Sequence, residues 1–333
     1  MNPPAPQQAP DGAAALAHWG VIRARGADAG AFLHGQLTND VQALDACRAV
    51  LAGYCSAKGR LLASFVVWRP AADEFLLACS ADLLAATLKR LRMFVLRAKC
   101  QLDDATAEVP LTGLAGPAAA AWLGDAAPAA VWARTAHDGA GAIRLPDAAG
   151  APRFLLPGPP PADLPALPLD AWRWLEVQSG VPTIEQATVD RFVPQMLNYE
   201  VLGGVDFRKG CYPGQEVVAR SQYRGTLKRR SFLFEIDPEA GVAGSAPAVA
   251  VHAGQEVFHT ADPAQPAGQV VNAAPWPQAA GGGLPATRWL ALVELKFALL
   301  DAAGTLHLGA PGGPPLRQVP LPYALPLLAV DPA

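Results

Sequence analysis

The residues best suited to chemistry lie in one segment of ten, from Phe207 to Glu216, with the sequence FRKGCYPGQE. A thiolate is the reactive form of cysteine, and positive charge beside the sulfur favours it. Arg208 and Lys209 precede Cys211 directly, and Arg220 follows nearby. The segment therefore predicts a functional thiol at Cys211.

The same segment contains residues that restrict its backbone. Glycine reaches positive φ and proline fixes φ, so Gly210, Pro213 and Gly214 would hold a tight loop. Such a loop gives the sulfur, the Gln215 amide and the Glu216 carboxylate one orientation. The alternative is a small, buried and inert side chain, as most free cysteines are.

Cations gather after this loop. Residues 208–230 contain seven Lys or Arg and one Glu, a local balance of +6. We expect Glu216–Gln222 and Thr226–Ile236 to pair as a hairpin around Arg224 and Gly225, with part of the charge on one face. That face would attract an anion. Alternatively, the cations keep a solvated strand edge from aggregating.

Composition restricts the class of protein. The 333 residues are 51% hydrophobic and 17% charged, with a net charge of −3, which gives no global attraction to nucleic acid. No apolar run approaches the ~20 residues of a membrane-spanning helix. Residues 1–14 lack the charged and apolar parts of a secretory signal and predict a disordered tail, so we expect a cytoplasmic protein. Five cysteines with no Cys-x-x-Cys pair argue against a disulfide framework and a permanent metal site.

Several elements can be predicted from periodicity. Gly20–Ala24 is typical of a strand, and Asp28 of the start of a helix. Leu61–Trp68 and Phe75–Ala78 predict a hairpin. A helix that begins near Ser80 or Asp82 and reaches Val95 has apolar residues at steps of three and four, so it should cover a sheet.

The second half of the chain contains breaks and a strand-rich tail. A proline-rich stretch near 157–168 indicates a linker. Leu169–Ser179 predicts a helix that ends before Gly180. Residues 237–250 mark a boundary, and we expect a small β-barrel after it with strands at Glu256–Thr260, Gln269–Asn272 and Trp289–Leu295.

The segment KGCYPGQE, Lys209 to Glu216, resembles the signature of the YgfZ-type folate-binding proteins, relatives of the glycine-cleavage aminomethyltransferase or T-protein. FLHGQLTND (Phe32–Asp40) and KGRLLA (Lys58–Ala63) resemble two further motifs of that family. The resemblance implies an α+β, T-protein-like multi-domain fold with mixed or antiparallel sheets covered by helices. Its folate-binding region would span residues 15–240 as two intertwined subdomains, and its C-terminal barrel residues 241–333.

The resemblance also implies folate contacts. The pattern RxxExxxG, Arg173 to Gly180, resembles the T-protein segment whose glutamate holds the pterin ring of tetrahydrofolate. A carboxylate at Glu176 can accept two parallel N–H bonds from such a ring. Without the resemblance, an exposed Arg173–Glu176 ion pair at i,i+3 is the simpler interpretation.

The ligand implied is tetrahydrofolate or a derivative, whose glutamate tail would be attracted to the cations of the loop. The pocket would then lie between the Leu169–Ser179 helix and residues 208–220. Tyr212 and Tyr199 are candidates for stacking on ligand rings, although a buried tyrosine usually serves packing. The expected folate-binding residues besides Glu176 are Arg208, Lys209, Asn39, Asp40 and Tyr199.

One departure from the T-protein pattern concerns catalysis. Aligned through Gly59, the aspartate pair of T-protein corresponds to Leu62 and Ala63, neither of which can exchange a proton. Aminomethyl transfer by that mechanism is therefore disfavoured, and whether the chain is an enzyme stays open. His34 stands where the family motif has a glutamine, and its role is also open.

Two functions follow from the resemblance. In the first, the chain is a tetrahydrofolate-binding accessory protein for iron-sulfur cluster assembly or repair, with Cys211 giving a thiolate to a transient cluster, a persulfide or a mixed disulfide. Its partners would be iron-sulfur proteins, with tRNA-modification enzymes as clients. In the second, it is a folate-dependent one-carbon transferase acting on protein or tRNA. A third possibility is a scaffold in which Cys211 is inert.

Overall fold

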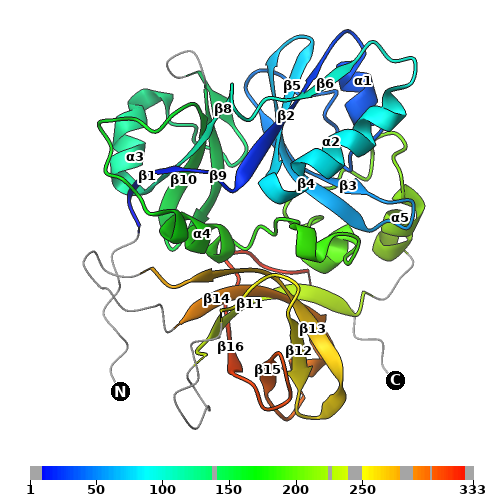
Figure 1. The fold of residues 1–333 in the computed structure, drawn as a ribbon, viewed down its shortest axis with the longest axis vertical. Helices are drawn as coiled ribbons and strands as arrows, with labels where there is room; N and C mark the ends of the chain where they lie inside the picture. The colour runs from blue at the N-terminus through cyan, green and yellow to red at the C-terminus, as the bar shows by residue number, and fades with distance from the viewer. Residues whose placement is uncertain are drawn as a thin grey trace.

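Two antiparallel sheets lie side by side above a closed β-barrel (Figure 1). The computed structural model describes residues 10–136, 141–223, 227–238, 250–277, 288–300 and 302–326. All strand ladders among these residues are antiparallel. The predicted α+β architecture with a C-terminal β-barrel is confirmed.

The first sheet has the strand order β3-β4-β5-β2-β6. Its elements are β2 (Trp19–Arg25), α1 (Ala29–His34), β3 (Ala49–Cys55), β4 (Leu61–Ala71), β5 (Glu74–Ser80), α2 (Ala81–Val95) and β6 (Gln101–Asp104). The long apolar runs of β4 and β5 form a buried hairpin, as the sequence predicts. The apolar stripe of α2 packs on this sheet, which is why its leucines recur at helical spacing.

The second sheet has the order β1-β7-β10-β9-β8. Its elements are β1 (Gly12–Ala15), β7 (Leu111–Ala115), α3 (Gly116–Leu123), η1 (Gly124–Ala126), β8 (Arg134–Thr135), β9 (Ala142–Ala148) and β10 (Ala151–Pro157). β1 pairs with β7, so residues 12–14 are not part of a disordered tail. Residues 1–9 of that predicted tail lie outside the described residues.

The proline-rich stretch after β10 lies along β1. The Ala13 amide donates to the Pro165 carbonyl, and the Leu167 amide donates to the Ala13 carbonyl. A Cβ on Gly12 would lie 2.3 Å from the Pro165 oxygen, so this close approach requires glycine. The predicted linker is therefore packed against the second sheet.

Four short elements connect the sheets to the barrel. They are α4 (Leu169–Gln178), η2 (Gln186–Thr188), η3 (Pro194–Leu197) and α5 (Gln215–Tyr223). The α4 helix ends where the sequence predicts, with Gly180 at φ +70°. It lies between the sheets and the barrel and packs on barrel strands β13 and β14, whose bounds follow (Figure 1).

The hairpin predicted over 216–236 is wrong in its first half, because residues 215–223 form the helix α5. Val218 is fully buried, and its carbonyl accepts a hydrogen bond from Gln195 Nε2. These tertiary contacts override the β preference of Val217 and Val218. Arg224 and Gly225 lie outside the described residues.

The barrel is closed in the order β11-β14-β13-β12-β15-β16. Its elements are β11 (Arg229–Ile236), β12 (Glu256–His259), β13 (Asp262–Pro275), β14 (Trp289–Lys296), η4 (Phe297–Leu299), β15 (Leu306–Leu308) and β16 (Pro315–Val319). The predicted start at residue 241 is wrong, since β11 pairs with both β14 and β16 and is needed for closure. Val251 at the boundary is already buried in the barrel core.

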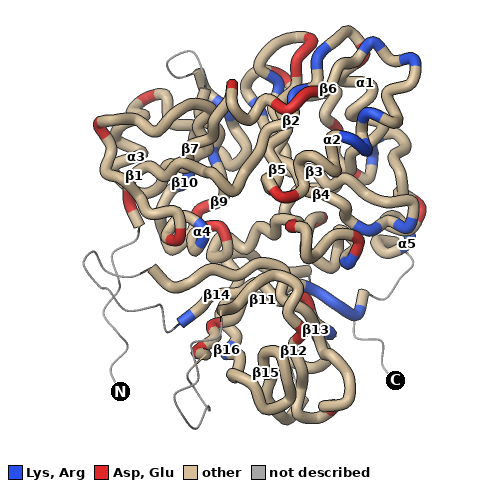
Figure 2. Tube along the Cα trace, viewed as in Figure 1, with Lys and Arg blue, Asp and Glu red and all other residues tan. Residues whose placement is uncertain are grey.

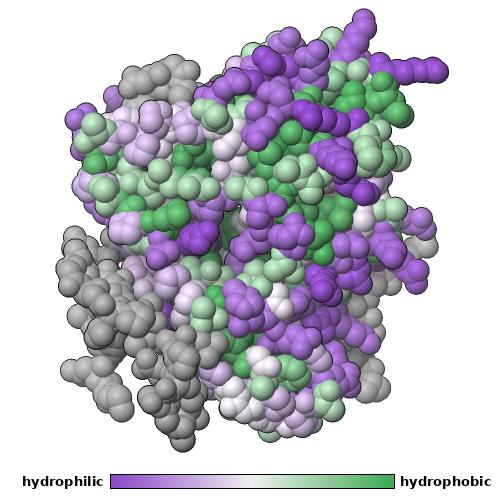
Figure 3. Space-filling model, in the orientation of Figure 1, coloured by the Kyte–Doolittle hydropathy of each residue, from purple (hydrophilic) through white to green (hydrophobic). Residues whose placement is uncertain are grey.

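The surface is uneven in charge and hydropathy. Figure 2 shows Lys and Arg around α1, α2 and α5, along one edge of the molecule. Met93, Phe94 and Leu96, at the end of α2, are exposed, and Figure 3 shows hydrophobic surface in the region of α2. None of the helices in the described ranges combines the length and apolar character needed to cross a membrane.

Candidate functional site

Glu176 is held at the inner side of α4 by three side-chain donors. His18 Nε2 donates to Oε2 at 2.8 Å, and the indole N–H groups of Trp19 and Trp172 each donate to Oε1 at 2.8 Å. Trp19 begins β2 and His18 directly precedes it, more than 150 residues away in the sequence. The carboxylate therefore joins the first sheet to α4.

Burial raises the pKa of Glu176, but His18, the Arg153 guanidinium and the Trp172 donor outweigh burial. The pKa lies below its usual value, so the group is ionised at neutral pH. No ion pair joins it to Arg173 in the part of the chain that the structure describes, so that alternative is not observed.

The bonding of Glu176 limits what it can offer a ligand. A carboxylate has about four lone-pair sites. The two indoles use those of Oε1, and His18 uses one of Oε2, which leaves one acceptor position. Two parallel N–H bonds to one ligand would require His18 or an indole to move.

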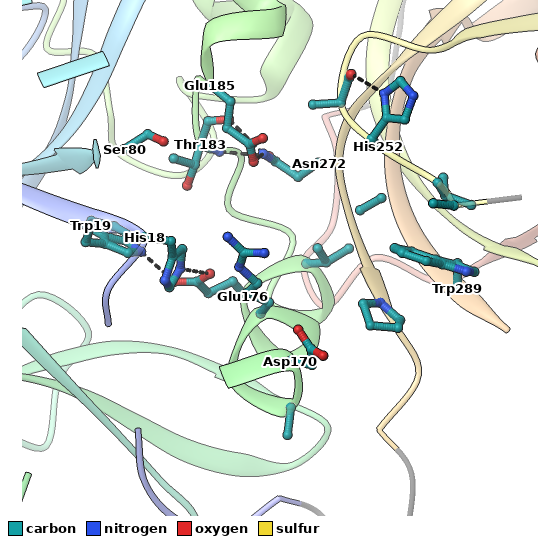
Figure 4. Close-up of a pocket in the computed structure, with 18 of the residues that line it drawn as sticks. His18, Trp19, Ser80, Asp170, Glu176, Thr183, Glu185, His252, Asn272 and Trp289 are labelled. Carbon is teal, nitrogen blue, oxygen red and sulfur yellow. Dashed lines mark hydrogen bonds and ion pairs between the residues drawn. The ribbon is translucent and has the colours of Figure 1, made fainter. Parts of the chain in front are cut away.

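A cleft of about 1160 Å³ opens beside Glu176, between α4 and the barrel. Figure 4 shows the side chains that line it, with His18, Trp19 and Glu176 on one side and Asn272 and Trp289 on the barrel side. We call this the Glu176 cleft. The aromatic side chains in its walls are Trp19, Trp276, Trp289, His18 and His252. Its size and indole surfaces suit a long ligand with flat rings.

A second carboxyl group lies further along the cleft. Asn272 Nδ2 donates to Glu185 Oε1 at 2.8 Å and also bonds the Thr183 carbonyl. Burial raises the pKa of Glu185 despite that hydrogen bond. Among the carboxyl groups that line the cleft, the pKa is therefore lowered at Glu176 and raised at Glu185.

A smaller cavity of about 30 Å³ lies where the two sheets meet α4. We call it the Arg153 cavity. Trp19, Glu176, Val181 and Thr183 line both it and the cleft. The two spaces are therefore neighbours with a shared wall.

The predicted thiol lies elsewhere. Cys211 is exposed, in the Cys211 loop, residues 207–216. Gly214 has φ +78°, and a Cβ there would lie 2.4 Å from the Ser56 carbonyl oxygen. Gly59 has φ +70°, and a Cβ there would lie 2.8 Å from the Cβ of Val217. The two glycines let the Cys211 loop pack closely on residues 56–60.

Lys209 fixes the Cys211 loop through hydrogen bonds to backbone carbonyls. Its Nζ donates to the carbonyls of His34 at 2.6 Å, Leu37 at 3.0 Å and Gly210 at 3.3 Å. It also lies 4.8 Å from the centroid of the buried Tyr212 ring. Burial lowers the pKa of Lys209 to about 8. The amine is used in the fold and is not presented to a ligand.

His34 lies beside the loop as well. Its Nε2 would be 3.3 Å from a Cβ on Gly210, and its Nδ1 donates to Asp40 Oδ1 at 3.0 Å. Asp40 also accepts the amides of Gln42 and Ala43, so it shapes a turn. Burial raises the pKa of Asp40, but these donors outweigh it and the pKa is lowered.

The other expected ligand residues have structural contacts. Asn39 Nδ2 donates to the carbonyls of Leu51 and Gly203. The buried Tyr199 hydroxyl donates to the Pro182 carbonyl. The side chain of Arg208 is 95% exposed, with Asp206 Oδ1 at 3.9 Å. None of these residues lines the Glu176 cleft or the Arg153 cavity.

The structure therefore separates what the sequence analysis placed together. Glu176 lines the cleft, whereas residues 208–220 do not, so the expected pocket between α4 and this segment is wrong. The remaining motif residues, Gln215, Glu216 and Arg220, lie in α5 and do not line the cleft either. In Figure 1, α4 and α5 lie on different sides of the molecule.

Several residues that line the cleft could not be predicted from the sequence. His18, Trp19, Glu185 and Asn272 have no motif around them, and an isolated tryptophan usually indicates a core position. On β4, Leu62 and Ala63 do not line either space, while Ser64 lines the Arg153 cavity and accepts the Ile184 amide. This part of β4 therefore contributes a hydroxyl group to the wall of the cavity, and no carboxyl group.

Comparisons with known proteins agree with the fold. Residues 12–138 match the family model described as GCVT N-terminal domain. The chain is 34% identical over 229 residues to "tRNA-modifying protein YgfZ" of Edwardsiella ictaluri, which covers 65% of this chain and 69% of the relative. It is 30% identical over 326 residues to the protein of that name from Serratia proteamaculans, covering 93% and 92%. Aminomethyltransferase T of the glycine cleavage system from Bartonella henselae superposes with a TM-score of 0.65 at 17% identity, covering 93% of this chain and 86% of that one.

Proposed function

The chain belongs to the YgfZ family, and from that premise we propose that it is a tetrahydrofolate-binding accessory protein for iron-sulfur cluster assembly or repair. Its relatives are named tRNA-modifying proteins. The clients would then include iron-sulfur enzymes that modify tRNA. The Glu176 cleft binds the folate, and Cys211 acts on the client.

The walls of the cleft support folate as its ligand. Tetrahydrofolate has a bicyclic ring, an aminobenzoyl ring and a carboxylate tail, so it needs a long space with flat apolar walls. The cleft offers about 1160 Å³ and the indoles of Trp19, Trp276 and Trp289. Glu176 keeps one acceptor position for a ring N–H. Arg173, which also lines the cleft, is a cation for the tail in place of Arg208 and Lys209.

The position of Cys211 favours an accessory role over a one-carbon transferase that uses this thiol. Reduced folate supplies one-carbon units, and their transfer to a nucleophile requires reacting atoms about 3 to 3.5 Å apart. Cys211 lines neither the cleft nor the Arg153 cavity. This separation is the observation that carries the proposal.

An exposed thiol on a rigid loop suits contact with a partner protein. Cys211 is exposed while Lys209 and Tyr212 on either side of it are buried, so the loop presents the sulfur without burying it. A thiolate is a good ligand for the iron of a cluster. Cys211 would occupy one coordination position of the cluster substrate during its delivery, without a change in oxidation state.

Calorimetric titration with tetrahydrofolate in oxygen-free, reducing buffer tests the ligand. The wild type and Cys211→Ala should bind with affinities within about twofold of each other, because the thiol is outside the cleft. Glu176→Ala should bind much more weakly. If the wild type does not bind, the folate assignment is wrong.

Complementation tests the thiol. In cells that depend on this protein, Cys211→Ala should lower the activity of iron-sulfur enzymes that modify tRNA while the protein stays abundant. Replacement of the other exposed cysteine, as Cys47→Ala, is the matched control and should have no effect. Full activity with Cys211→Ala would rule out the role proposed for this thiol.

A further inference from the structure

Arg153 is a buried cation with unused donors. It lies on β10, and the residue is 3% exposed. Its Nε and Nη1 are buried and have no hydrogen-bond partner in the structure. No carboxylate in the described ranges forms an ion pair with it. Most buried polar groups in proteins are hydrogen-bonded, so this guanidinium is unusual.

The surroundings of Arg153 compensate its charge only in part. Its guanidinium carbon lies 5.0 Å from the centroid of the Trp172 ring, and the charge of Glu176 acts on it from a distance. Burial lowers the pKa of Arg153 to about 10, although Glu176 and Asp147 act in the opposite direction. The group is charged at neutral pH, and it lacks the acceptors that a buried charge requires.

The Arg153 cavity is the space that this side chain lines. Its volume of about 30 Å³ has room for about two water-sized groups. Ser64 and Ser179 lie in its wall together with the ring of Trp132. Glu176 lines both this cavity and the cleft, so Arg153 lies on the far side of a wall that the two spaces share.

We propose that the Arg153 cavity is a subsite for an oxygen acceptor, in which the Arg153 guanidinium binds a carbonyl or carboxylate group of the ligand held in the Glu176 cleft. The identity of that ligand rests on the proposed function. Glu176 accepts an N–H and Arg153 donates to an oxygen, so the pair fits a cyclic amide edge with N–H beside C=O. The pterin ring has such an edge.

A buried guanidinium without an acceptor should destabilise the free protein and strengthen the binding of a ligand that supplies one. Replacing a buried ion pair by apolar side chains is often neutral or stabilising. A buried charge without a paired acceptor costs more still, so its removal should not destabilise the free protein. A hydrogen bond from a charged donor contributes about 1.5 to 3 kcal/mol to binding, which corresponds to about tenfold or more in affinity. A purely structural arginine would show neither effect.

The test uses Arg153→Met, which keeps length and removes charge. Thermal unfolding of the unliganded protein should occur at the same or a higher temperature than in the wild type, while the Kd for tetrahydrofolate rises about tenfold or more. Arg144→Met is the matched control, since Arg144 lies on the neighbouring strand β9 over the Phe154 ring. Its Kd should stay within about twofold of the wild type.

A second arm uses sodium formate against sodium chloride at equal ionic strength, because a free carboxylate has the same acceptor chemistry. Formate that stabilises the wild type but not Arg153→Met supports the subsite even if folate does not bind, in which case the proposed function alone fails. If Arg153→Met binds folate as the wild type does, and formate protection is absent or unchanged in the variant, the inference is overturned and the folate site stands. An unfolding temperature that falls with unchanged Kd would make Arg153 a structural residue.

Discussion

The Glu176 cleft and the Cys211 loop are both fixed by contacts distant in sequence, but they differ in access. Glu176 accepts hydrogen bonds from His18, Trp19 and Trp172, which fix its position. Cys211 is exposed above an anchored backbone. In the proposed function, the first region holds a small molecule and the second presents one sulfur atom to a large partner. Neither arrangement could do the task of the other.

The strongest way to test this comparison is Glu176→Gln. The amide puts a donor where the ligand needs an acceptor, so we expect the Kd for tetrahydrofolate to rise about 100-fold. Alkylation of Cys211 by iodoacetamide should proceed at the wild-type rate, because the loop is outside the cleft. Glu216→Gln, on α5, is the control and should leave the Kd unchanged. A changed alkylation rate in Glu176→Gln would show that the regions are coupled.

A smaller effect is expected from Lys209→Met, which acts on the other region. Three carbonyls lose their donor, and the sulfur loses a nearby positive charge. We expect unfolding to be easier by about 2 to 3 kcal/mol and alkylation of Cys211 to slow about threefold. Arg208→Gln should leave the free energy of unfolding nearly unchanged, since the Arg208 side chain is 95% exposed. Faster alkylation in Lys209→Met would mean that the loop itself limits access to the sulfur.

The smallest expected effect is a pH dependence specific to the cleft. The pKa of Glu176 is lowered in the folded protein, so the unfolded chain binds its proton more readily. The stability it contributes is present above the unfolded value of 4.5 and is lost as pH falls through the folded pKa. Urea midpoints of the wild type and Glu176→Gln should therefore converge as pH decreases below about 4.5. Parallel curves from pH 6 to 3.5 would contradict this assignment.

The sequence predicted elements where local signals agree with packing. Gly180 ends α4, the leucines of α2 face the first sheet, and Gly214 sits in a turn that needs positive φ. The strand predicted at Glu216–Gln222 is wrong, and the residues form α5. Val218 is buried by contacts with η3 that no local sequence pattern encodes. The boundary at 241 failed because closure of the barrel requires β11, a pairing between distant strands.

Site prediction had a similar limit. The motif predicts a functional thiol at Cys211; the structure shows that this residue is exposed, and its role stays a prediction. The charge of Lys209 and the motif that contains Asp40 indicated ligand contacts, yet both side chains form hydrogen bonds with backbone groups. His18, Trp19 and Arg153 gave no signal, because their importance arises only when three segments of the chain meet at α4.

That meeting of segments has a consequence for synthesis of the protein. The cleft needs Trp19, α4, β13 and Trp289 together, and the Tyr323 hydroxyl donates to the Gly180 carbonyl at the end of α4. A nascent chain on the ribosome therefore has no complete cleft until β14 has emerged. Earlier still, His18 and Trp19 have no Glu176 to bind until more than 150 further residues have been translated. The folate proposed for this cleft would therefore stabilise the protein only after most of the chain has been made, and would act late in its maturation and not on its initial folding.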